Sequence, residues 1–596
     1  MRLSSFLFVA FFLFTTAFSQ EISYKLRMTK PQNHYFQVEM NLVDFKQSEL
    51  VVKMPVWAPG SYLVREFSRN VDLVKAFDEN GKALAVTKQT KNAWSIARGS
   101  AKKVRVQYEV YSFELSVRTS FLDLTHGYIS GSGVFMYVEG FKDKKGSLEI
   151  FKHANFKRIT TALEKNAESV ASDGSEVFIF DNYDQLVDCP IEIGNHEVFE
   201  FKASGVQHTV AIFGEGNYAI PRLQADMAKV VEAATSIVGE NPNKKYTFII
   251  HNVVDGQGGL EHTNSTTLSV NRWTYEGSAY VDFLALVAHE YFHLWNVKRI
   301  RPIELGPFNY DEENYTSLLW VMEGWTSYYE DLIVRRAGFI TSEDYISRMQ
   351  STVNYVEGSV GSRVQPVAHA SFDAWVKAYR PNENSANTTM TYYSRGGMLA
   401  AQLDAKIISK YKGEKSLDHF LRVLYNKYYK ELNRGFSEKE FKDELGKFMG
   451  ENMDDFFAKY VDGTEVTPLN ETFGLLGINV ESVGYAKPSL GTSLREDGGK
   501  VIVRSIRSNS SAENAGLSVN DEIIGCNGYR VDQKAFENFV AGLSAGDKFS
   551  ILISRDEILL ELEVSIENYL KPQYVFKVNA SDAKKTQLRN YWLRTI

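Results

Sequence analysis

The sequence predicts a multidomain α+β protein, and three observations support this. The chain has 596 residues, which is too long for one hydrophobic core and indicates about three or four domains. From residue 21 to about 181, short runs alternate between apolar and polar residues. Several later stretches, between 281 and 428, repeat apolar residues about every 3.6 positions. After residue 467 short alternating runs return. Strand-rich regions are therefore expected on either side of a helical middle.

The N-terminal region, expected over 20–181, is predicted to be a β-sandwich. The runs 35–40 and 104–110 alternate as strands do, and 78–81 has the composition of a hairpin turn. Many short strands separated by turns are typical of a sandwich. The stretch 55–62 is rich in Pro and Gly and is expected to be a loop that exposes its aromatic residues.

The middle region, expected over 182–466, begins with strands and one helix and becomes helical from about residue 340. Helical periodicity is found in five stretches: 281–296, 316–337, 342–356, 398–412 and 416–428. Residues 467–568 have short strands around one small helix near 511–515, and a module of that size can fold alone. The last segment, 569–596, gives no clear pattern.

The first nineteen residues have the features of a signal peptide. Arg2 precedes an apolar stretch over 6–16, and Ala17, Phe18 and Ser19 form a cleavage site of small-residue type. An uncleaved anchoring helix is the alternative interpretation. No later segment has the run of about 18 apolar residues that a membrane span needs. We therefore expect a secreted or periplasmic protein without a permanent membrane span.

Charge and cysteine content narrow the range of partners. The formal net charge is −7, with acidic and basic residues mixed along the chain. Nucleic acids and anionic membranes bind basic faces, so neither is an expected partner. The two cysteines, Cys189 and Cys526, fall in different expected domains, and no disulfide between them is predicted.

The strongest chemical signal is the motif His289-Glu290-Tyr-Phe-His293 within an apolar helical pattern. Two histidines four positions apart lie on one face of a helix, where both imidazoles can bind one Zn²⁺. Glu290 lies beside them and can reach a water molecule at the metal. The motif also occurs by chance, so the rest of the site has to support it.

A catalytic zinc ion needs a third protein ligand and an open fourth position. Glu323 lies thirty residues after His293 in an apolar stretch, where an unpaired carboxylate is costly, so it is the predicted third ligand. Glu330, seven residues further on the same helical face, is expected to orient a ligand histidine. Asp331 is the alternative for that role.

Two further segments are candidates for binding substrate. Gly258, Gly259 and Glu261 follow an apolar run; glycines there allow close approach of a peptide backbone, and Glu261 offers a negative charge to an α-ammonium group. Tyr392 and Tyr393 precede a later helix. A tyrosine hydroxyl near the zinc can stabilise an oxyanion, but position alone does not distinguish the two.

In this order, the four segments resemble the glycyl aminopeptidase family of zinc metallopeptidases, relatives of the alanyl aminopeptidases and leukotriene hydrolases. The resemblance is carried by the stretch HEYFHLWNVKRIRP at 289–302, by Leu319-Trp320, by EGWTSYYE at 323–330 and by PVWAPGSYLVREF at 55–67. It covers about residues 21–565. The middle region is then expected to be a thermolysin-like α/β catalytic domain with a helical C-terminal part.

The resemblance implies specific roles for the matching residues. The zinc ligands are His289, His293 and Glu323, the general base is Glu290, the group that binds the substrate amine is Glu261, and the tyrosine that stabilises the transition state is Tyr393. The chain departs from the relatives' patterns at Leu260 and His262, and again at Ser394 and Arg395. The implied substrates are peptides with a free N-terminal Gly or Ala.

The C-terminal module resembles a PDZ domain. Its signature is the segment 511–517, followed by 521–524 and by Asn527-Gly528. The segment 487–491 would be the carboxylate-binding loop, although it departs from the usual sequence. Such a module binds a peptide C-terminus or an added strand, but a structural role is equally open.

Three alternatives to a zinc aminopeptidase remain at this stage. They are a zinc endopeptidase with the same metal site, which Glu261 disfavours, a PDZ-based peptide-binding scaffold with a vestigial metal site, and an epoxide hydrolase like some relatives. Retention of His289, Glu290, His293 and Glu323 argues against the scaffold.

Overall fold

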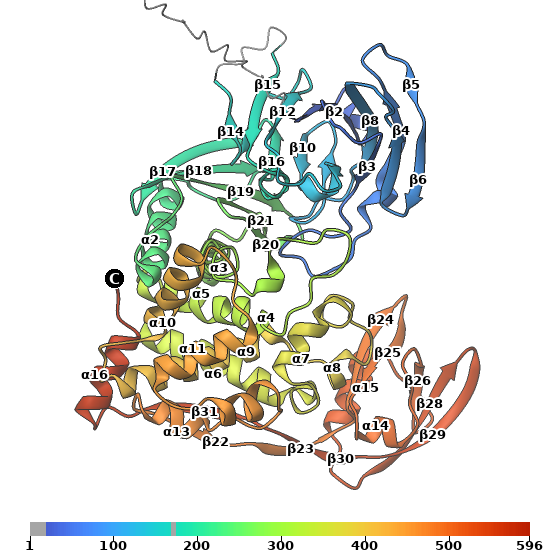
Figure 1. Cartoon of the computed structure of the whole chain (residues 1–596). Coiled ribbons are helices and arrows are strands. Elements are labelled where there is room, and N and C mark those ends of the chain that lie inside the picture. The colour runs from blue at the N-terminus through green and yellow to red at the C-terminus, as the bar shows by residue number, and fades with distance from the viewer. Residues whose placement is uncertain (1–19, 168–173) are drawn as a thin grey trace, which may run out of the picture.

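The structure is a computed structural model that describes residues 20–167 and 174–596. The expected signal peptide, 1–19, lies outside the described residues. Figure 1 shows the N-terminal sheets in blue beside a central sheet in green, helices in yellow and orange beneath that sheet, and a separate C-terminal group of strands in red. The multidomain α+β prediction is confirmed. Within the described residues no helix combines the length and apolar character needed to cross a membrane.

The N-terminal region is a β-sandwich, as the alternating pattern predicts. Along the first strand the side chains are alternately buried and exposed, because successive residues point to opposite faces. The main sheet has the order β14 (Glu164–Lys165), β15 (Glu176–Phe180), β12 (Gly146–Phe151), β1 (Glu21–Arg27), β2 (Tyr35–Val43), β8 (Lys103–Tyr111), β4 (Val71–Phe77), β5 (Ala83–Leu84). Side chains from β1, β2 and β8 form the core of this domain.

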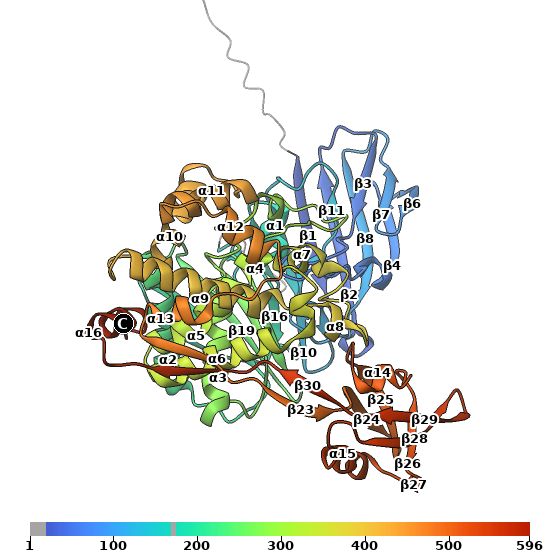
Figure 2. The same cartoon turned by 90° about the horizontal axis from the view of Figure 1, so that it is seen from below.

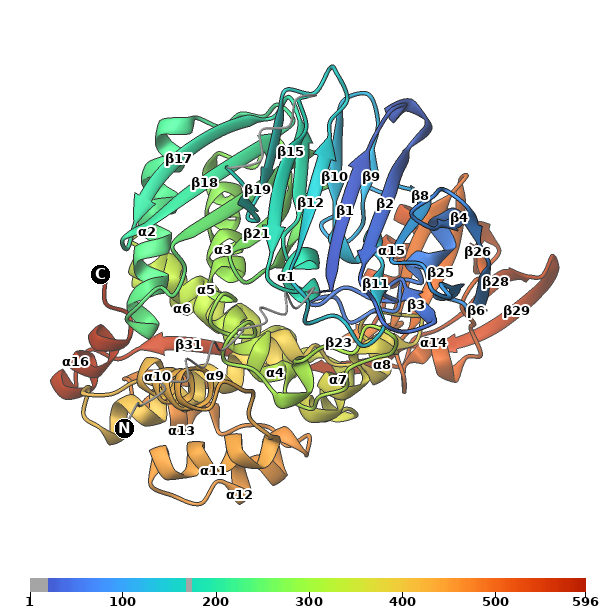
Figure 3. The same ribbon diagram turned by 45° about the horizontal axis from the view of Figure 1, so that its top comes forward.

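The N-terminal domain extends past residue 181, where its end was expected. Strand β16 (Ile191–Gly194) pairs with β10 (His126–Ile129) in a smaller sheet. All four residues of β16 are buried, so the strand lacks the alternation that marks the earlier ones. This sheet lies beside the central sheet of the next domain (Figure 3).

A buried charged cluster joins these two domains. Glu192 accepts hydrogen bonds from His126 Nδ1 (2.8 Å) and from His251 Nε2 (2.9 Å), and all three side chains are excluded from solvent. Burial by itself raises the pKa of Glu192, but the two histidines outweigh this effect and lower it to about 2. The cluster therefore holds an ionised carboxylate between the domains.

The loop 55–62 does not expose its aromatic residues, so that expectation is wrong. Trp57 and Tyr62 are buried. Both rings pack edge-on against Trp375, with centroids 5.1 and 5.6 Å away, and Trp57 Nε1 donates to the carbonyl of Asn309. The loop is therefore packed between the N-terminal domain and the helical part of the next domain.

The central domain begins with a five-stranded sheet. Its order is β17 (Glu197–Ala203), β18 (Val206–Phe213), β19 (Lys245–Val253), β21 (Ser265–Asn271), β20 (Gln257–Glu261). Strands β18, β19 and β21 are parallel, whereas β20 is antiparallel to β21 and forms the edge. The helices α2 (Ile220–Val238) and α3 (Gly277–Phe292) pack beneath this sheet (Figure 1).

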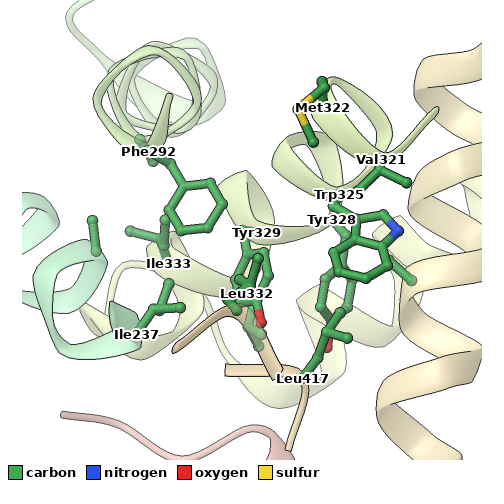
Figure 4. Packing of buried hydrophobic residues seen from close by; sticks show 14 of the residues in the cluster. Ile237, Phe292, Val321, Met322, Trp325, Tyr328, Tyr329, Leu332, Ile333 and Leu417 are labelled. Atoms are coloured by element: carbon green, nitrogen blue, oxygen red, sulfur yellow. The ribbon is translucent and has the colours of Figure 1, made fainter. Parts of the chain in front are cut away.

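The helical part of the domain follows the predicted periodicity. Its main elements are α4 (Leu319–Met322), α5 (Gly324–Arg336), α6 (Ser342–Gly358), α9 (Tyr392–Lys410) and α10 (Leu417–Leu424). Figure 4 shows Phe292 of α3, Tyr329 and Ile333 of α5 and Leu417 of α10 in one buried cluster. Helices α5 and α9 touch at Gly324, where an added Cβ would overlap Gly396. This close contact brings the start of α9 to the residues between α4 and α5.

The C-terminal module has its own small core. Its sheet contains β24 (Thr492–Asp497), β25 (Lys500–Ile506), β26 (Glu522–Cys526), β28 (Lys548–Arg555) and β29 (Ile558–Ser565). Helix α15 (Gln533–Ala541) lies against its edge strand β24. Cys526 is buried here and Cys189 is buried in the N-terminal core, and neither forms a disulfide.

The last segment, 569–596, returns from this module to the helical domain (Figure 2). The ribbon of β23 (Tyr485–Ser489) and β30 (Glu567–Lys571) leads to a second ribbon of β22 (Ile478–Ser482) and β31 (Tyr574–Val578). Helix α16 (Ala583–Trp592) then packs against the helical core, where Trp592 Nε1 donates to the hydroxyl of Tyr328 at 2.7 Å. Both ends of the 467–596 region therefore contribute to the hydrophobic core of the central domain.

Candidate active site

Helix α3 carries the two histidines of the motif at its C-terminal end. His289 lies in the last turn and His293 caps the helix. Their ring centroids are 4.7 Å apart, because residues four positions apart lie one above the other on a helix. Both rings are almost fully buried. The Nε2 atoms of both rings face the same side chain, Glu323.

Glu323 lies at the junction of α4 and α5 and is 2% exposed. Its Oε2 atom is 3.6 Å from His289 Nε2 and 3.3 Å from His293 Nε2. Burial by itself raises the pKa of Glu323, but His293 and His289 outweigh this effect and lower it to about 2. The site therefore brings together two imidazoles and one ionised carboxylate, as the sequence predicts.

Hydrogen bonds at the other nitrogen of each ring fix the two imidazoles. His289 Nδ1 donates to Glu330 Oε2 at 2.5 Å, and His293 Nδ1 donates to the carbonyl of Asn296 at 2.8 Å. Asp331, the alternative to Glu330, instead forms an ion pair with Arg348 at 3.0 Å. Each Nε2 atom thus faces Glu323 and is oriented to bind a metal ion together with that carboxylate.

This donor set fits a zinc ion. One donor atom from each of His289, His293 and Glu323 can be chosen so that all lie within 4.8 Å of one another. Catalytic zinc sites commonly use two histidines and one glutamate, with a hydrogen-bond acceptor behind each imidazole. His289, His293 and Glu323 would hold the zinc ion and leave its fourth coordination position open.

Glu290 points into the same region and is 5% exposed. Its Oε2 atom has no hydrogen-bond partner among the described residues. Burial raises its pKa to about 7, a value suited to a group that accepts and returns a proton near neutral pH. Gly259 is required beside it, because an added Cβ there would overlap the Glu290 carboxylate.

Strand β20 places the third carboxylate, Glu261, close to Glu290 and His293. One donor atom from each of these three lies within 4.8 Å of the others. Glu261 is 4% exposed, and its Oε1 atom has no hydrogen-bond partner among the described residues. An unpaired buried carboxylate is costly. Together with Glu290 and Glu323 it leaves the site short of positive charge, which a metal ion and an ammonium group would supply.

Of the two candidate tyrosines, Tyr393 faces the site. Its ring centroid lies 6.3 Å from that of His289, whereas Tyr392 stacks behind it at 4.8 Å. Burial, and then the nearby Glu323 charge, raise the pKa of Tyr393 well above its usual value, so the hydroxyl keeps its proton. Arg395, where the motif departs from the relatives, is buried in an ion pair with Glu357 at 3.0 Å.

Three residues near the site were not identified from the sequence. Burial, and then the nearby Glu323 charge, raise the pKa of Tyr379; burial, and then the charges of Glu323 and Glu261, raise the pKa of Tyr62. Arg118 Nη2 donates to the carbonyl of Gly259 at 3.3 Å. None of them belongs to a short motif of known spacing, although Tyr62 lies in the distinctive 55–62 loop.

His262, where the chain differs from its relatives, points away from the metal-binding groups. Its Nδ1 atom donates to Asp188 at 3.0 Å, and Lys298 forms an ion pair with the same carboxylate at 2.9 Å. Asp188, the residue before Cys189, follows helix α1 (Tyr183–Val187). This position therefore joins segments of the chain instead of lining the site.

Comparison with known proteins identifies similar domains along the chain. Family models match at 23–195 (Peptidase M61 N-terminal domain), at 282–399 (M61 glycyl aminopeptidase) and at 488–566 (PDZ domain). None of the curated proteins matches the chain.

Many solved structures are similar to the chain, including the following two. The crystal structure of an aminopeptidase N family protein from Idiomarina loihiensis is 29% identical, with a TM-score of 0.88 over 96% of this chain and 100% of that one. An M1 zinc metallopeptidase from Deinococcus radiodurans is 13% identical, with a TM-score of 0.49 over 76% of this chain and 95% of that one. The three family models lie in the expected order, and the first of these structures spans nearly the whole chain. The chain therefore carries domains that match the N-terminal and catalytic domains of the M61 glycyl aminopeptidase family, and it is a metallopeptidase with a C-terminal PDZ domain.

Proposed function

We propose that the chain is a zinc-dependent aminopeptidase that removes a small N-terminal residue, Gly or Ala, from peptides. The observation that carries this proposal is the buried Glu261 carboxylate beside the metal-binding side chains, whose Oε1 atom has no hydrogen-bond partner among the described residues. A peptide α-ammonium bound there would neutralise a charge that is otherwise left unpaired. A site that must hold the free amine cleaves one residue inward.

Zinc bound by His289, His293 and Glu323 would acidify water and polarise the scissile carbonyl. Glu290 accepts the proton of the attacking water and then donates it to the leaving amine. The Tyr393 hydroxyl donates a hydrogen bond to the carbonyl oxygen as negative charge develops on that atom. Glu330 and the Asn296 carbonyl keep both imidazoles oriented throughout.

The surroundings of Glu261 favour a small first residue. The N-terminal domain covers this end of the site with the loop 55–62. A Cβ placed on Gly60 would lie 2.5 Å from Glu261 Oε1 and 2.8 Å from a methyl carbon of Leu260. Little space is left around the amine, and a bulky first side chain would have to displace this loop. Preference for Gly or Ala follows from that crowding.

Turnover of amino-acid anilides tests the proposal. The wild-type protein is expected to cleave Gly- and Ala-anilides well, Leu- and Phe-anilides poorly, and the N-acetylated forms hardly at all. Dialysis against a chelator should abolish turnover, and about one equivalent of Zn²⁺ per chain should restore it. Equal cleavage of blocked and free substrates would instead identify an endopeptidase.

We also propose that the protein acts outside the cytoplasm, on the basis of the pattern in its first nineteen residues. N-terminal sequencing of protein recovered from an expressing cell tests this. The expected mature N-terminus is Gln20, directly after the Ala17-Phe18-Ser19 site. An intact Met1 would contradict it.

A further inference from the structure

A large cavity separates the helical domain from the PDZ domain. Its volume is about 930 Å³, at the upper end of the range found for ligand sites. Tyr379, Tyr392 and Tyr393 line it on one side. On the other side it is lined by the ribbon of β23 and β30 and by the start of β24. The cavity therefore belongs to neither domain alone.

The cavity begins at the active site. Tyr393 lines it and at the same time lies 6.3 Å, ring to ring, from His289. Glu261, the proposed contact for the substrate amine, is not among the cavity-lining residues. A peptide whose N-terminus is held by Glu261 and whose first peptide bond lies at the metal-binding groups would extend past Tyr393. The residues that follow the scissile bond would then enter this cavity.

The charged residues that line the cavity are all positive. They are Lys487 on β23, Lys571 on β30 and Arg507 directly after β25, and no Asp or Glu lines the cavity. Among the described residues none of the three forms an ion pair, although the chain as a whole carries a net charge of −7. The Arg507 guanidinium lies 3.6 Å from the ring centroid of Tyr569 and donates to Ser489 Oγ, so it is held in position.

The PDZ domain is attached firmly enough for these cations to have a defined position. Asn387 of the helical domain donates to the carbonyl of Ile506 at 2.8 Å and accepts from the amide of Ser508 at 2.9 Å. Asn354 exchanges two hydrogen bonds with the backbone of Tyr574. The Lys571 side chain also reaches the helical domain at Gly358. The two walls of the cavity are therefore linked on both sides.

From these observations we propose that the cavity binds the C-terminal part of the substrate peptide, and that Lys487, Lys571 and Arg507 recognise a carboxylate there. This inference rests on the proposed aminopeptidase function. The PDZ domain then acts on the same peptide that the metal site cleaves. Preferred substrates are short peptides whose terminal or side-chain carboxylate reaches the cations.

Calorimetric binding to the zinc-loaded, full-length Glu290→Gln variant tests this without turnover. The peptides are Ala-Gly-Gly-Gly as the free acid, the same peptide as the C-terminal amide, and Ala-Gly-Gly-Asp as the amide. An exposed charge pair contributes up to about fivefold in Kd. With two or more of the three cations contributing, the free acid should bind about tenfold more tightly than the amide. The Asp peptide measures whether a side-chain carboxylate substitutes for the terminal one.

Adding Lys487→Gln, Lys571→Gln and Arg507→Gln together should bring the acid-to-amide ratio close to one. Lys548→Gln is the matched control, because Lys548 is an exposed lysine of the same domain that does not line the cavity; it should leave the ratio and Ala-anilide turnover unchanged. Equal binding of acid and amide before the three cations are changed would overturn the inference, and so would a ratio that survives the triple substitution. Failure of the wild-type protein to cleave any free-amine anilide would instead refute the proposed function.

Discussion

Gly60, in the N-terminal domain, is predicted to control the position of the Glu261 carboxylate. A Cβ at this position would lie 2.5 Å from Glu261 Oε1, whereas ordinary van der Waals contact begins near 3.4 Å. In Gly60→Ala the carboxylate must move by about 0.9 Å. A displacement of about 1 Å can cost about a hundredfold in rate when it misplaces a reacting group. Because the end of a glutamate side chain can move, we expect a small effect on folding and a large effect on amine binding.

The assay is kcat/KM for Ala-anilide and for N-acetyl-Ala-anilide, together with zinc content and Tm. Gly60→Ala should lower kcat/KM for Ala-anilide by about tenfold to a hundredfold. It should leave kcat/KM for N-acetyl-Ala-anilide nearly unchanged. Zinc content should not fall, because none of the metal-binding side chains is touched.

Gly81→Ala is the matched control. Gly81 has φ +80°, close to the +87° of Gly60, but an added Cβ would meet nothing within 4 Å. Both variants should lose about 1 kcal/mol of stability from the left-handed backbone, and only Gly60→Ala should lose amine selectivity. Equal kinetic effects of the two variants would refute the reasoning, since backbone strain alone would then explain them.

Three further predictions concern the metal site and acid stability. Glu323→Ala should lose zinc, measured by metal analysis, whereas Glu290→Gln should retain zinc and lose turnover; full zinc in Glu323→Ala would refute the ligand assignment. Glu330→Gln should weaken zinc binding by about tenfold to a hundredfold in a chelator competition. The control is Asp331→Asn, which changes the next residue, a carboxylate engaged in a separate ion pair, and should bind zinc as tightly as wild type. Glu192 has a folded-state pKa lowered from 4.5 to about 2, so its stabilising effect is present above pH 4.5 and is lost as the pH falls toward 2. The lowered pKa corresponds to about 3 kcal/mol of folding free energy. The Tm of the wild type should therefore exceed that of Glu192→Gln by less and less as the pH falls below 4.5. A Tm difference that stays constant with pH would contradict this prediction.

The metal-binding constellation was largely predictable because its geometry is local. The spacing of His289 and His293 fixes their relative position on a helix, and Glu330 is seven residues, or two turns, beyond Glu323. Glu323 could be singled out because a carboxylate in an apolar stretch needs a partner. Choosing Tyr393 over Tyr392 required the resemblance, because neighbouring tyrosines at the start of a helix are equivalent in sequence.

Features that depend on contacts between distant segments were not predictable. The aromatic residues of the 55–62 loop are buried because Trp375, more than three hundred residues later, packs against them. The segment 569–596 has no strong periodicity, yet Trp592 reaches the core beside Tyr328. The cations of the cavity belong to a domain whose placement the sequence does not give. In each case the decisive interaction joins residues with no sequence relationship.

The most direct test of the account is the effect of Glu261→Gln on the choice between free and blocked substrates. The substitution keeps the shape of the side chain and removes its charge. A charge-assisted contact with the α-ammonium is worth about 1.5–3 kcal/mol, or about tenfold to a hundredfold in kcat/KM. The account predicts that the ratio of kcat/KM for Ala-anilide to that for N-acetyl-Ala-anilide falls by this factor, with zinc content unchanged. An equal loss on both substrates, or no loss on either, would contradict the proposal that Glu261 makes this metallopeptidase an aminopeptidase.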